Sequence, residues 1–139
     1  MVIEKLCAIK NFSNLREIAI NKDLAKLGDN FVNFIYSLAK SCVLGQFSGW
    51  KLPDKVLAQA LRDADLRFLI STKSSAHDLG DAVESLIVYA WVFQKFSLEE
   101  LTTILYNQLK TGDFSDKKKE ERSAIQAFTA VLLEIKNSV

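Results

Sequence analysis

The sequence has little proline, glycine, cysteine or histidine, and each scarcity excludes a class of protein. One proline and five glycines in 139 residues leave long uninterrupted stretches, which favours helices over a turn-rich sheet. The two cysteines, Cys7 and Cys42, form no metal-spaced pair and no disulfide framework. Both have apolar neighbours at helical spacing, so we expect them to be small core residues. The single histidine excludes sites that need several histidine ligands.

A strong net charge and a long apolar run are also absent. The formal net charge is +1, so a nucleic acid would have to bind a local basic patch rather than a generally basic surface. The longest apolar run, residues 86–93, is too short to span a membrane, and the first residues lack the apolar core of a signal peptide. The length is typical of one domain. We therefore expect a single cytoplasmic domain over residues 1–139.

Apolar residues recur at steps of three and four along most of the chain, which is the period of an amphipathic helix. Residues 23–43 should form one long helix. Asp54 is expected to cap a second helix after the loop of residues 45–54. Asp78 is expected to cap a third helix after the loop of residues 71–77, and this third helix should be the central buried one.

Two further helices are predicted in the C-terminal part of the chain. Ser97 and Glu100 have the spacing of a capping box, in which serine is followed three residues later by glutamate. The final helix should begin near Ser115 and has three consecutive lysines in its first turns, where the helix dipole disfavours positive charge. No segment shows the alternation typical of a β-strand. The predicted fold class is therefore a compact all-α domain.

Two Gly-Asp pairs, Gly28-Asp29 and Gly80-Asp81, place carboxylates on helices that are otherwise mostly apolar. Asp81 and Glu84 are three residues apart, so their Cβ atoms should lie about 5–6 Å apart on one helix face and could share a divalent cation. Asp29 could complete the site if the two helices pack together. Such oxygen ligands suit Mg²⁺ or Mn²⁺, which activate water and stabilise phosphoryl charge. Spacing alone equally allows Asp29 and Asp81 to be first-turn acids and Glu84 to be exposed.

The order of these motifs resembles that of the ribonuclease III family. Leu-Ala-Lys-Leu-Gly-Asp29-Asn-Phe-Val-Asn-Phe-Ile resembles the family signature Glu-Arg-Leu-Glu-Phe-Leu-Gly-Asp followed by an apolar helix. Asp81-Ala-Val-Glu84-Ser-Leu-Ile resembles the second family motif, Asp-x-x-Glu-Ala-Leu-Ile. The interval between the motifs also matches, so the resemblance covers residues 24–91. It implies an all-helical homodimer that cuts double-stranded or structured RNA by Mg²⁺- or Mn²⁺-assisted hydrolysis, with Asp29, Asp81 and Glu84 as its catalytic metal ligands.

Two acids of the family signature are replaced in this chain. The glutamate four residues before the first aspartate falls on Ala25, and the earlier signature glutamate falls on Lys22. In this respect the chain resembles Mini-III ribonucleases, minimal forms without a double-stranded-RNA-binding domain, whose signature also has a small residue at the Ala25 position. No such domain is expected here, so RNA phosphates and 2′-hydroxyls should contact the catalytic domain itself. The candidate RNA contacts are Lys51, Lys55, Lys73, Lys117, Lys118 and Lys119.

Two other functions fit parts of the sequence. A ribonuclease III-like scaffold that binds RNA or protein without catalysis would keep the fold and lose the active site. An all-helical Mg²⁺-dependent nucleotide pyrophosphohydrolase would also use helical carboxylates, but the acidic pairs at residues 99–100 and 120–121 do not recur three residues apart. His77-Asp78 is similar to the motif of His-Asp phosphohydrolases, which need further histidines. We therefore interpret His77 as a loop residue beside a helix cap.

Overall fold

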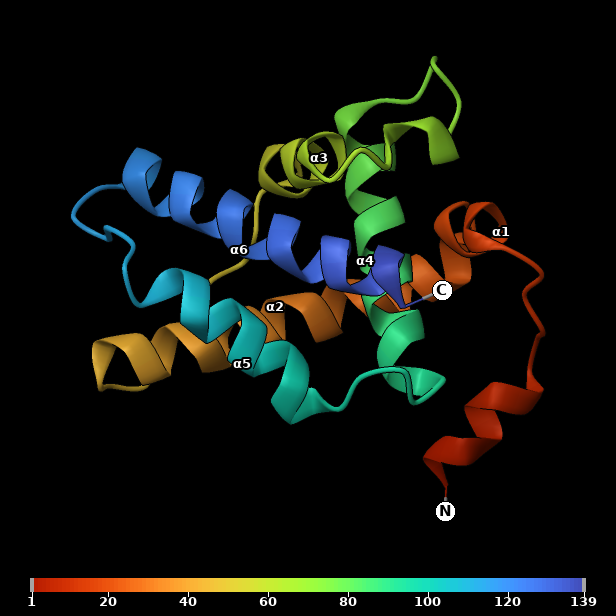
Figure 1. Cartoon of the computed structure of the whole chain (residues 1–139), viewed down its shortest axis with the longest axis horizontal. Helices are drawn as coiled ribbons and strands as arrows, with labels where there is room; N and C mark the ends of the chain where they lie inside the picture. Colours follow the sequence, from red (N-terminus) through yellow and green to blue (C-terminus); the bar gives the residue numbers. More distant parts are fainter. Residues whose placement is uncertain (1, 139) are drawn as a thin grey trace.

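The computed structural model describes residues 2–138, and within that range the regular secondary structure is entirely helical. This confirms the all-α prediction. None of the described helices is long and apolar enough to cross a membrane. In chain order, and as drawn in Figure 1, the elements are the 3-10 helix η1 (Ile3–Ala8), α1 (Leu15–Ala19), α2 (Lys22–Leu44), α3 (Asp54–Asp63), the 3-10 helix η2 (Arg67–Leu69), α4 (Ala76–Val92), α5 (Leu98–Leu109) and α6 (Lys117–Asn137).

Helix α2 is the long amphipathic helix that the sequence predicts for residues 23–43. The side chain of Asn21 caps its start by accepting a hydrogen bond from the Leu24 amide at 2.8 Å. At its end, Gly45 has φ 69°, a left-handed conformation that glycine adopts without a steric penalty. Val32 and Ile35 on its apolar face are completely buried. Local sequence signals therefore set both ends of α2, and the apolar period sets its buried face.

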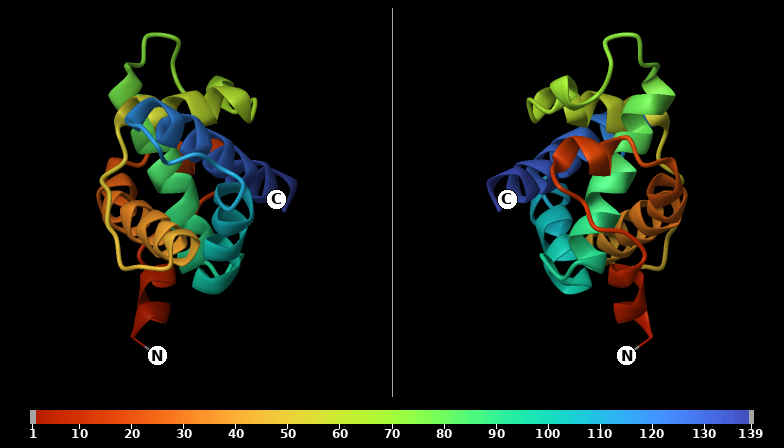
Figure 2. Two further views of the ribbon diagram at one scale, coloured as in Figure 1. Left: turned by 90° about the vertical axis from the view of Figure 1, so that its left-hand side faces the viewer. Right: turned by 90° about the vertical axis from the view of Figure 1, so that its right-hand side faces the viewer.

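Helix α4 is the central helix, as predicted. It packs against α1, α2, α3 and α6, and Figure 1 shows it running across α2 and α6. Leu86 and Ile87, near its middle, have no exposed surface. A helix surrounded on several sides must be apolar on several sides, which explains why this segment holds the longest apolar run in the chain. The short helix η1 lies at the margin of the bundle, as Figure 2 shows from two sides.

The starts of α3 and α4 differ from the sequence prediction. Pro53 occupies the cap position of α3, and Asp54 is the first helical residue instead of the cap. Helix α4 is capped by Ser75, and Asp78 completes a capping box by accepting a hydrogen bond from the Ser75 amide at 3.0 Å. Both aspartates satisfy the positive end of a helix dipole, which is why they looked like caps. One consequence is that His77 lies in the first turn of α4 and not in a loop.

The C-terminal helices begin close to where the sequence predicts. The capping box of α5 is present, because the Glu100 amide donates to Ser97 Oγ at 2.9 Å and the Ser97 amide donates to Glu100 Oε1 at 3.0 Å. Helix α6 begins at Lys117, two residues after the predicted start at Ser115, and Asp116 caps it. The Asp116 carboxylate accepts a hydrogen bond from the Lys119 amide at 2.9 Å and adds negative charge beside the lysine-rich first turn.

The prediction that both cysteines are core residues is wrong for one of them. Cys7 is half-buried and donates a hydrogen bond from Sγ to the Val92 carbonyl oxygen at 3.2 Å. Cys42 is exposed. Near the end of α2 the inward side is formed by Ala39 and Val43, which leaves Cys42 on the outer side of the helix.

Candidate functional site

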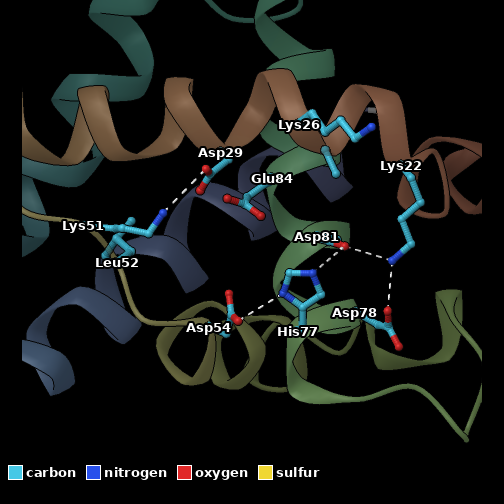
Figure 3. A pocket seen from close by; sticks show the side chains of 11 residues that line it. Lys22, Lys26, Asp29, Lys51, Leu52, Asp54, His77, Asp78, Asp81 and Glu84 are labelled. Carbon is cyan, nitrogen blue, oxygen red and sulfur yellow. Dashed lines mark hydrogen bonds and ion pairs between the residues drawn. The ribbon is translucent and has the colours of Figure 1, made fainter.

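The site begins with the crossing of α2 and α4 at Gly28. A Cβ atom on Gly28 would overlap the backbone carbonyl group of Glu84, so only glycine lets the two helices approach this closely. Asp29 directly follows Gly28, and the side chain of Glu84 starts from the backbone that Gly28 touches. The close crossing therefore brings the acids of two distant motifs together. Figure 3 shows the carboxylates of Asp29 and Glu84 on the same side of this crossing.

A cavity of about 610 Å³ opens beside this crossing. Its walls come from the first turns of α2, α3 and α4 and from the segment before α3. The lining includes all three residues that the sequence predicts as metal ligands. The lining residues are Lys22, Ala25, Lys26, Asp29, Lys51, Leu52, Asp54, His77, Asp78, Asp81 and Glu84.

Glu84 is the most deeply placed acid of this cavity. It is only 6% exposed, and within residues 2–138 no basic side chain contacts it. Burial raises the pKa of Glu84 to about 9, and hydrogen bonding to Asp29 together with the negative charges of Asp29, Asp81 and Asp54 adds to the increase. Its surroundings therefore favour the protonated form of this carboxyl group. The interpretation that Glu84 is a solvent-exposed residue is wrong.

Asp29 is held at the cavity wall by two side chains. Asn33, one turn later on α2, donates from Nδ2 to Asp29 Oδ1 at 3.2 Å, and Lys51 Nζ lies 3.7 Å from Asp29 Oδ2. Asn33 also accepts a hydrogen bond from the Leu52 amide at 2.7 Å, which fastens the segment before α3 to α2. Asp29 lies beyond the first turn of α2, so its place is explained by these partners and not by the helix dipole.

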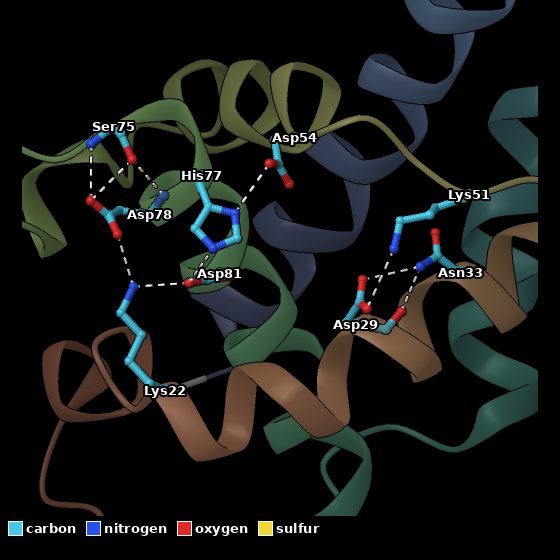
Figure 4. Close-up of polar contacts among 9 residues, drawn as sticks. All are labelled: Lys22, Asp29, Asn33, Lys51, Asp54, Ser75, His77, Asp78 and Asp81. Carbon is cyan, nitrogen blue, oxygen red and sulfur yellow. Dashed lines mark hydrogen bonds and ion pairs between the residues drawn. The ribbon is translucent and has the colours of Figure 1, made fainter.

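Asp81 points toward the side chains of Lys22 and His77, as Figure 4 shows. Lys22 Nζ lies 2.9 Å from Asp81 Oδ2 and 2.9 Å from Asp78 Oδ1, while His77 Nε2 lies 3.5 Å from Asp81 Oδ2. His77 Nδ1 also lies 3.2 Å from Asp54 Oδ2. These contacts raise the pKa of Lys22, chiefly through the hydrogen bond to Asp81, and raise the pKa of His77, chiefly through the hydrogen bond to Asp54. Lys22 lowers the pKa of Asp78 to about 2.

The acids of the cavity are suitable ligands for a divalent cation, but their side chains do not converge on one point. Within residues 2–138, no three Asp, Glu, His or Cys side chains are arranged so that they surround a metal ion. Asp29 and Glu84 approach each other, whereas Lys22 and His77 hold Asp81. A buried carboxyl group without a basic partner, next to a second carboxylate, is what a hard cation would stabilise. The acids are therefore of the type that binds Mg²⁺ or Mn²⁺, but as described they do not surround an ion.

Lys22, Asp54 and His77 are among the cavity residues that the sequence did not assign to the site. Lys22 was noted only as a departure from the family signature, Asp54 as a helix cap and His77 as a loop residue. The spacing of four between His77 and Asp81 on one helix is a signal that could have found His77. Nothing in the sequence predicts that α3 brings Asp54 to the same cavity, because that contact depends on tertiary packing.

Of the six lysines predicted to contact RNA, only Lys51 lines the cavity. Lys55 on α3 lies 3.3 Å from Glu121 Oε1 on α6, and Lys119 lies 3.6 Å from Asp113 Oδ2. Lys117 and Lys118 are exposed in the first turn of α6, and Lys73 is exposed in the segment between η2 and α4. The six lysines therefore come from the cavity rim, α3, the start of α6 and a loop.

Comparison with known proteins gives one finding on the family. A family model described as Ribonuclease III matches residues 22–139, a range that begins with α2 and contains every residue of the cavity. No curated protein sequence matches the chain. The matched range excludes η1 and α1.

Proposed function

Because the chain belongs to the ribonuclease III family, we propose that it is an endoribonuclease that hydrolyses phosphodiester bonds in double-stranded or structured RNA. Proteins of this family generally use divalent metal ions and act on double-stranded RNA. Asp29, Asp81 and Glu84 form the proposed metal site. The observation that carries this proposal is the meeting of Glu84 and Asp29 at the glycine crossing of α2 and α4, inside an acidic cavity.

Each residue of the site has a distinct part in this proposal. A bound Mg²⁺ or Mn²⁺ would supply a Lewis acid that activates water and offsets charge on the scissile phosphate. Burial and Asp29 raise the pKa of Glu84 and favour its protonated form, so metal binding at this carboxyl group would displace a proton. Asn33 orients Asp29 through its hydrogen bond to Oδ1.

RNA would be held by lysines through its phosphates. Lys51 is the best-placed candidate, since its side chain is 79% exposed at the cavity rim and contacts Asp29 only at 3.7 Å. Such a contact is worth little in water, so a phosphate can replace it at low cost. Lys55, Lys73 and the lysines at the start of α6 extend the candidate surface beyond the cavity.

A homodimer is the proposed assembly, and α2 contains a surface that suits it. Leu27 and Phe34 are seven residues apart on α2 and are 42% and 53% exposed. Next to them, Phe31 stacks on Trp91 of α4 with ring centroids 4.8 Å apart. Exposed apolar side chains in a row along one helix are typical of an interface between subunits. A two-fold dimer would present two sites to the two strands of one RNA duplex.

The test is cleavage of duplex, hairpin and single-stranded RNA with and without Mn²⁺, using the wild type and Glu84→Gln. The glutamine keeps the shape of the side chain but cannot ionise, so we expect a rate loss of about a hundredfold or more. Glu134→Gln, which changes an exposed glutamate of α6 outside the cavity, is the matched control and should cleave like the wild type. Undiminished cleavage by a folded Glu84→Gln variant would overturn the metal-site assignment.

A second candidate function, the non-catalytic scaffold, is favoured by the salt bridges of the cavity. Lys22 replaces a signature acid and pairs with Asp81, and Lys51 pairs with Asp29. Metal binding separates the two functions, because a scaffold stabilised by these pairs has no need of Mn²⁺. A melting temperature that rises with millimolar Mn²⁺ in the wild type but not in Glu84→Gln supports the enzyme. The family match makes a nucleotide pyrophosphohydrolase the weakest of the three candidates.

A further inference from the structure

Lys22 bridges the two helices that form the site. It is the first residue of α2, and its ammonium group donates hydrogen bonds of 2.9 Å to Asp78 Oδ1 and of 2.9 Å to Asp81 Oδ2, both on α4. Figure 4 shows the lysine side chain extended between the two carboxylates. The Asp81 side chain is only 15% exposed, whereas that of Lys22 is 56% exposed.

The ammonium group of Lys22 already occupies one of the two Asp81 oxygens that a metal ion could bind. Asp81 Oδ2 accepts from Lys22, and His77 Nε2 lies 3.5 Å from it on another side. A divalent cation bound to that oxygen would stand within a few ångströms of the lysine charge, and the two would repel each other strongly at that distance. Lys22 pairing and metal binding at Asp81 therefore oppose each other.

We propose that Lys22 is a tethered cation that competes with the divalent ion for Asp81, so that ion binding must release Lys22 from its carboxylates. This inference rests on the proposed metal site. It makes Lys22 a positioning residue that lowers the affinity of the site for Mg²⁺ and Mn²⁺. The family signature has an acid at this position, so the substitution reverses the sign of one charge in the cavity.

The bridge is not needed to hold the two helices in place. Asn21 caps α2 without Lys22, and Ser75 with Asp78 caps α4 through backbone amides. Ser85 Oγ also donates to the Asn21 carbonyl oxygen at 3.0 Å, which joins the start of α2 to α4 independently. Replacing Lys22 should therefore leave the fold intact and change mainly the charge beside Asp81.

The experiment measures Mn²⁺ affinity by calorimetry for the wild type and for Lys22→Met, which keeps the chain length and removes the charge. We expect the variant to bind Mn²⁺ about three- to thirtyfold more tightly, the range for losing two partly exposed ion pairs. Lys26→Met is the matched control. Lys26 lines the same cavity, but its side chain is 82% exposed and reaches only Asp23, at 4.0 Å. Its removal should change the affinity less than twofold.

A second readout follows the lysine directly. In NMR spectra, the hydrogen-bonded ammonium signal that is missing from Lys22→Met belongs to Lys22. This signal should disappear or shift as diamagnetic Mg²⁺ is added to the wild type. Equal Mn²⁺ affinity of Lys22→Met and the wild type would contradict the proposed competition, but it would not contradict the proposed metal site. An equal gain in Lys26→Met would also overturn it, because general electrostatics would then explain the effect. No Mn²⁺ binding by any of the proteins would contradict both the competition and the metal site. Lys22→Gln repeats the test if Lys22→Met does not fold.

Discussion

At the scale of single residues, Glu84 makes folding depend on pH. Its pKa is raised from 4.5 to about 9 because the carboxyl group is buried and faces other acids. In the unfolded chain the same group ionises near its ordinary pKa. The stability that Glu84 supplies is therefore fully present below pH 4.5 and is lost as the pH rises through 9.

The corresponding prediction compares the wild type with Glu84→Gln in the absence of divalent ions. Between pH 4.5 and about 9 the free energy of unfolding of the wild type should fall relative to the variant, by up to about 1.4 kcal/mol per pH unit. Denaturant unfolding at several pH values measures the difference. Other groups, including His77, contribute equally to both proteins. Parallel stability curves would contradict the raised pKa of Glu84.

The acids of the site were predictable from the sequence, but their partners were not. Asp81 and Glu84 lie three apart on one helix, and the motif order supplies Asp29, so local spacing and resemblance were sufficient. Lys22 stands seven residues before Asp29 and so shares its helix face, but its pairing with Asp81 and the arrival of Asp54 depend on the packing of α2 and α3 on α4. The charge balance of the cavity could therefore be read only from the fold.

At the scale of helices, Gly28 decides how closely α2 and α4 pack. Replacing glycine by alanine inside a helix ordinarily stabilises it by about 0.5–1 kcal/mol. Here the added Cβ would overlap the Glu84 backbone, so Gly28→Ala should instead destabilise the protein by about 1–3 kcal/mol and weaken Mn²⁺ binding. Chemical denaturation and calorimetry measure the two effects.

The matched control makes the same substitution where there is space. A Cβ on Gly49 would have Ser37 Oγ as its nearest neighbour, at 3.9 Å. Gly49→Ala should therefore change the stability by less than about 0.5 kcal/mol. If Gly28→Ala is neutral or stabilising, α2 and α4 can move apart without a loss of stability. The fold would then not depend on their close crossing.

Helices α2 and α6 are joined by a buried ion pair that the sequence did not predict. Lys40 Nζ and Tyr36 Oη both donate to Glu120 Oε2 at 2.8 Å, and the side chains of Lys40 and Glu120 are only 12% and 13% exposed. Lys40 also lies over the ring of Trp50, 5.6 Å from its centroid. Burial, with the Glu120 charge, raises the pKa of Tyr36, so its hydroxyl group remains a donor.

Breaking this pair should be costly, because removing one charge leaves the other buried. Glu120→Gln keeps the size of the side chain, and we expect it to lower the free energy of unfolding by about 2–4 kcal/mol. Asp23→Asn, which breaks an ion pair between side chains that are 97% and 82% exposed, should cost less than about 0.5 kcal/mol. An equal decrease in the free energy of unfolding of the two variants would show that the buried pair contributes no more to stability than the exposed pair.

Helix ends show where local sequence is a sufficient guide. The capping box at Ser97 and Glu100 predicted the observed start of α5. At α3 and α4 the first-turn aspartates were mistaken for caps, because an acid and a cap satisfy the same helix dipole. The true cap of α4, Ser75, stands three residues before Asp78 and so has the same spacing as the α5 box.

At the scale of the whole molecule, the core was predictable in type but not in arrangement. Apolar periods at steps of three and four gave the helices and identified α4 as central. They did not give the order in which α1, α2, α3 and α6 surround α4, because many packings bury the same apolar faces. They also left unexplained why several large apolar side chains, Leu27 and Phe34 among them, are exposed on the monomer.

The last prediction follows from that exposed apolar row on α2. In a two-fold interface centred on Leu27 and Phe34, the same surface of both subunits is buried. One substitution therefore changes the interface at two symmetric positions. Phe34→Glu adds a charge at both places, and we expect it to shift the protein from dimer to monomer at micromolar concentration while the helical circular dichroism stays unchanged. Sedimentation velocity measures the change. Phe68→Glu, at an apolar residue of η2 that is 65% exposed, is the control and should remain dimeric. A wild type that is monomeric well above micromolar concentration would contradict the interface, and the two strands of an RNA duplex would then have to be cut by one site in turn.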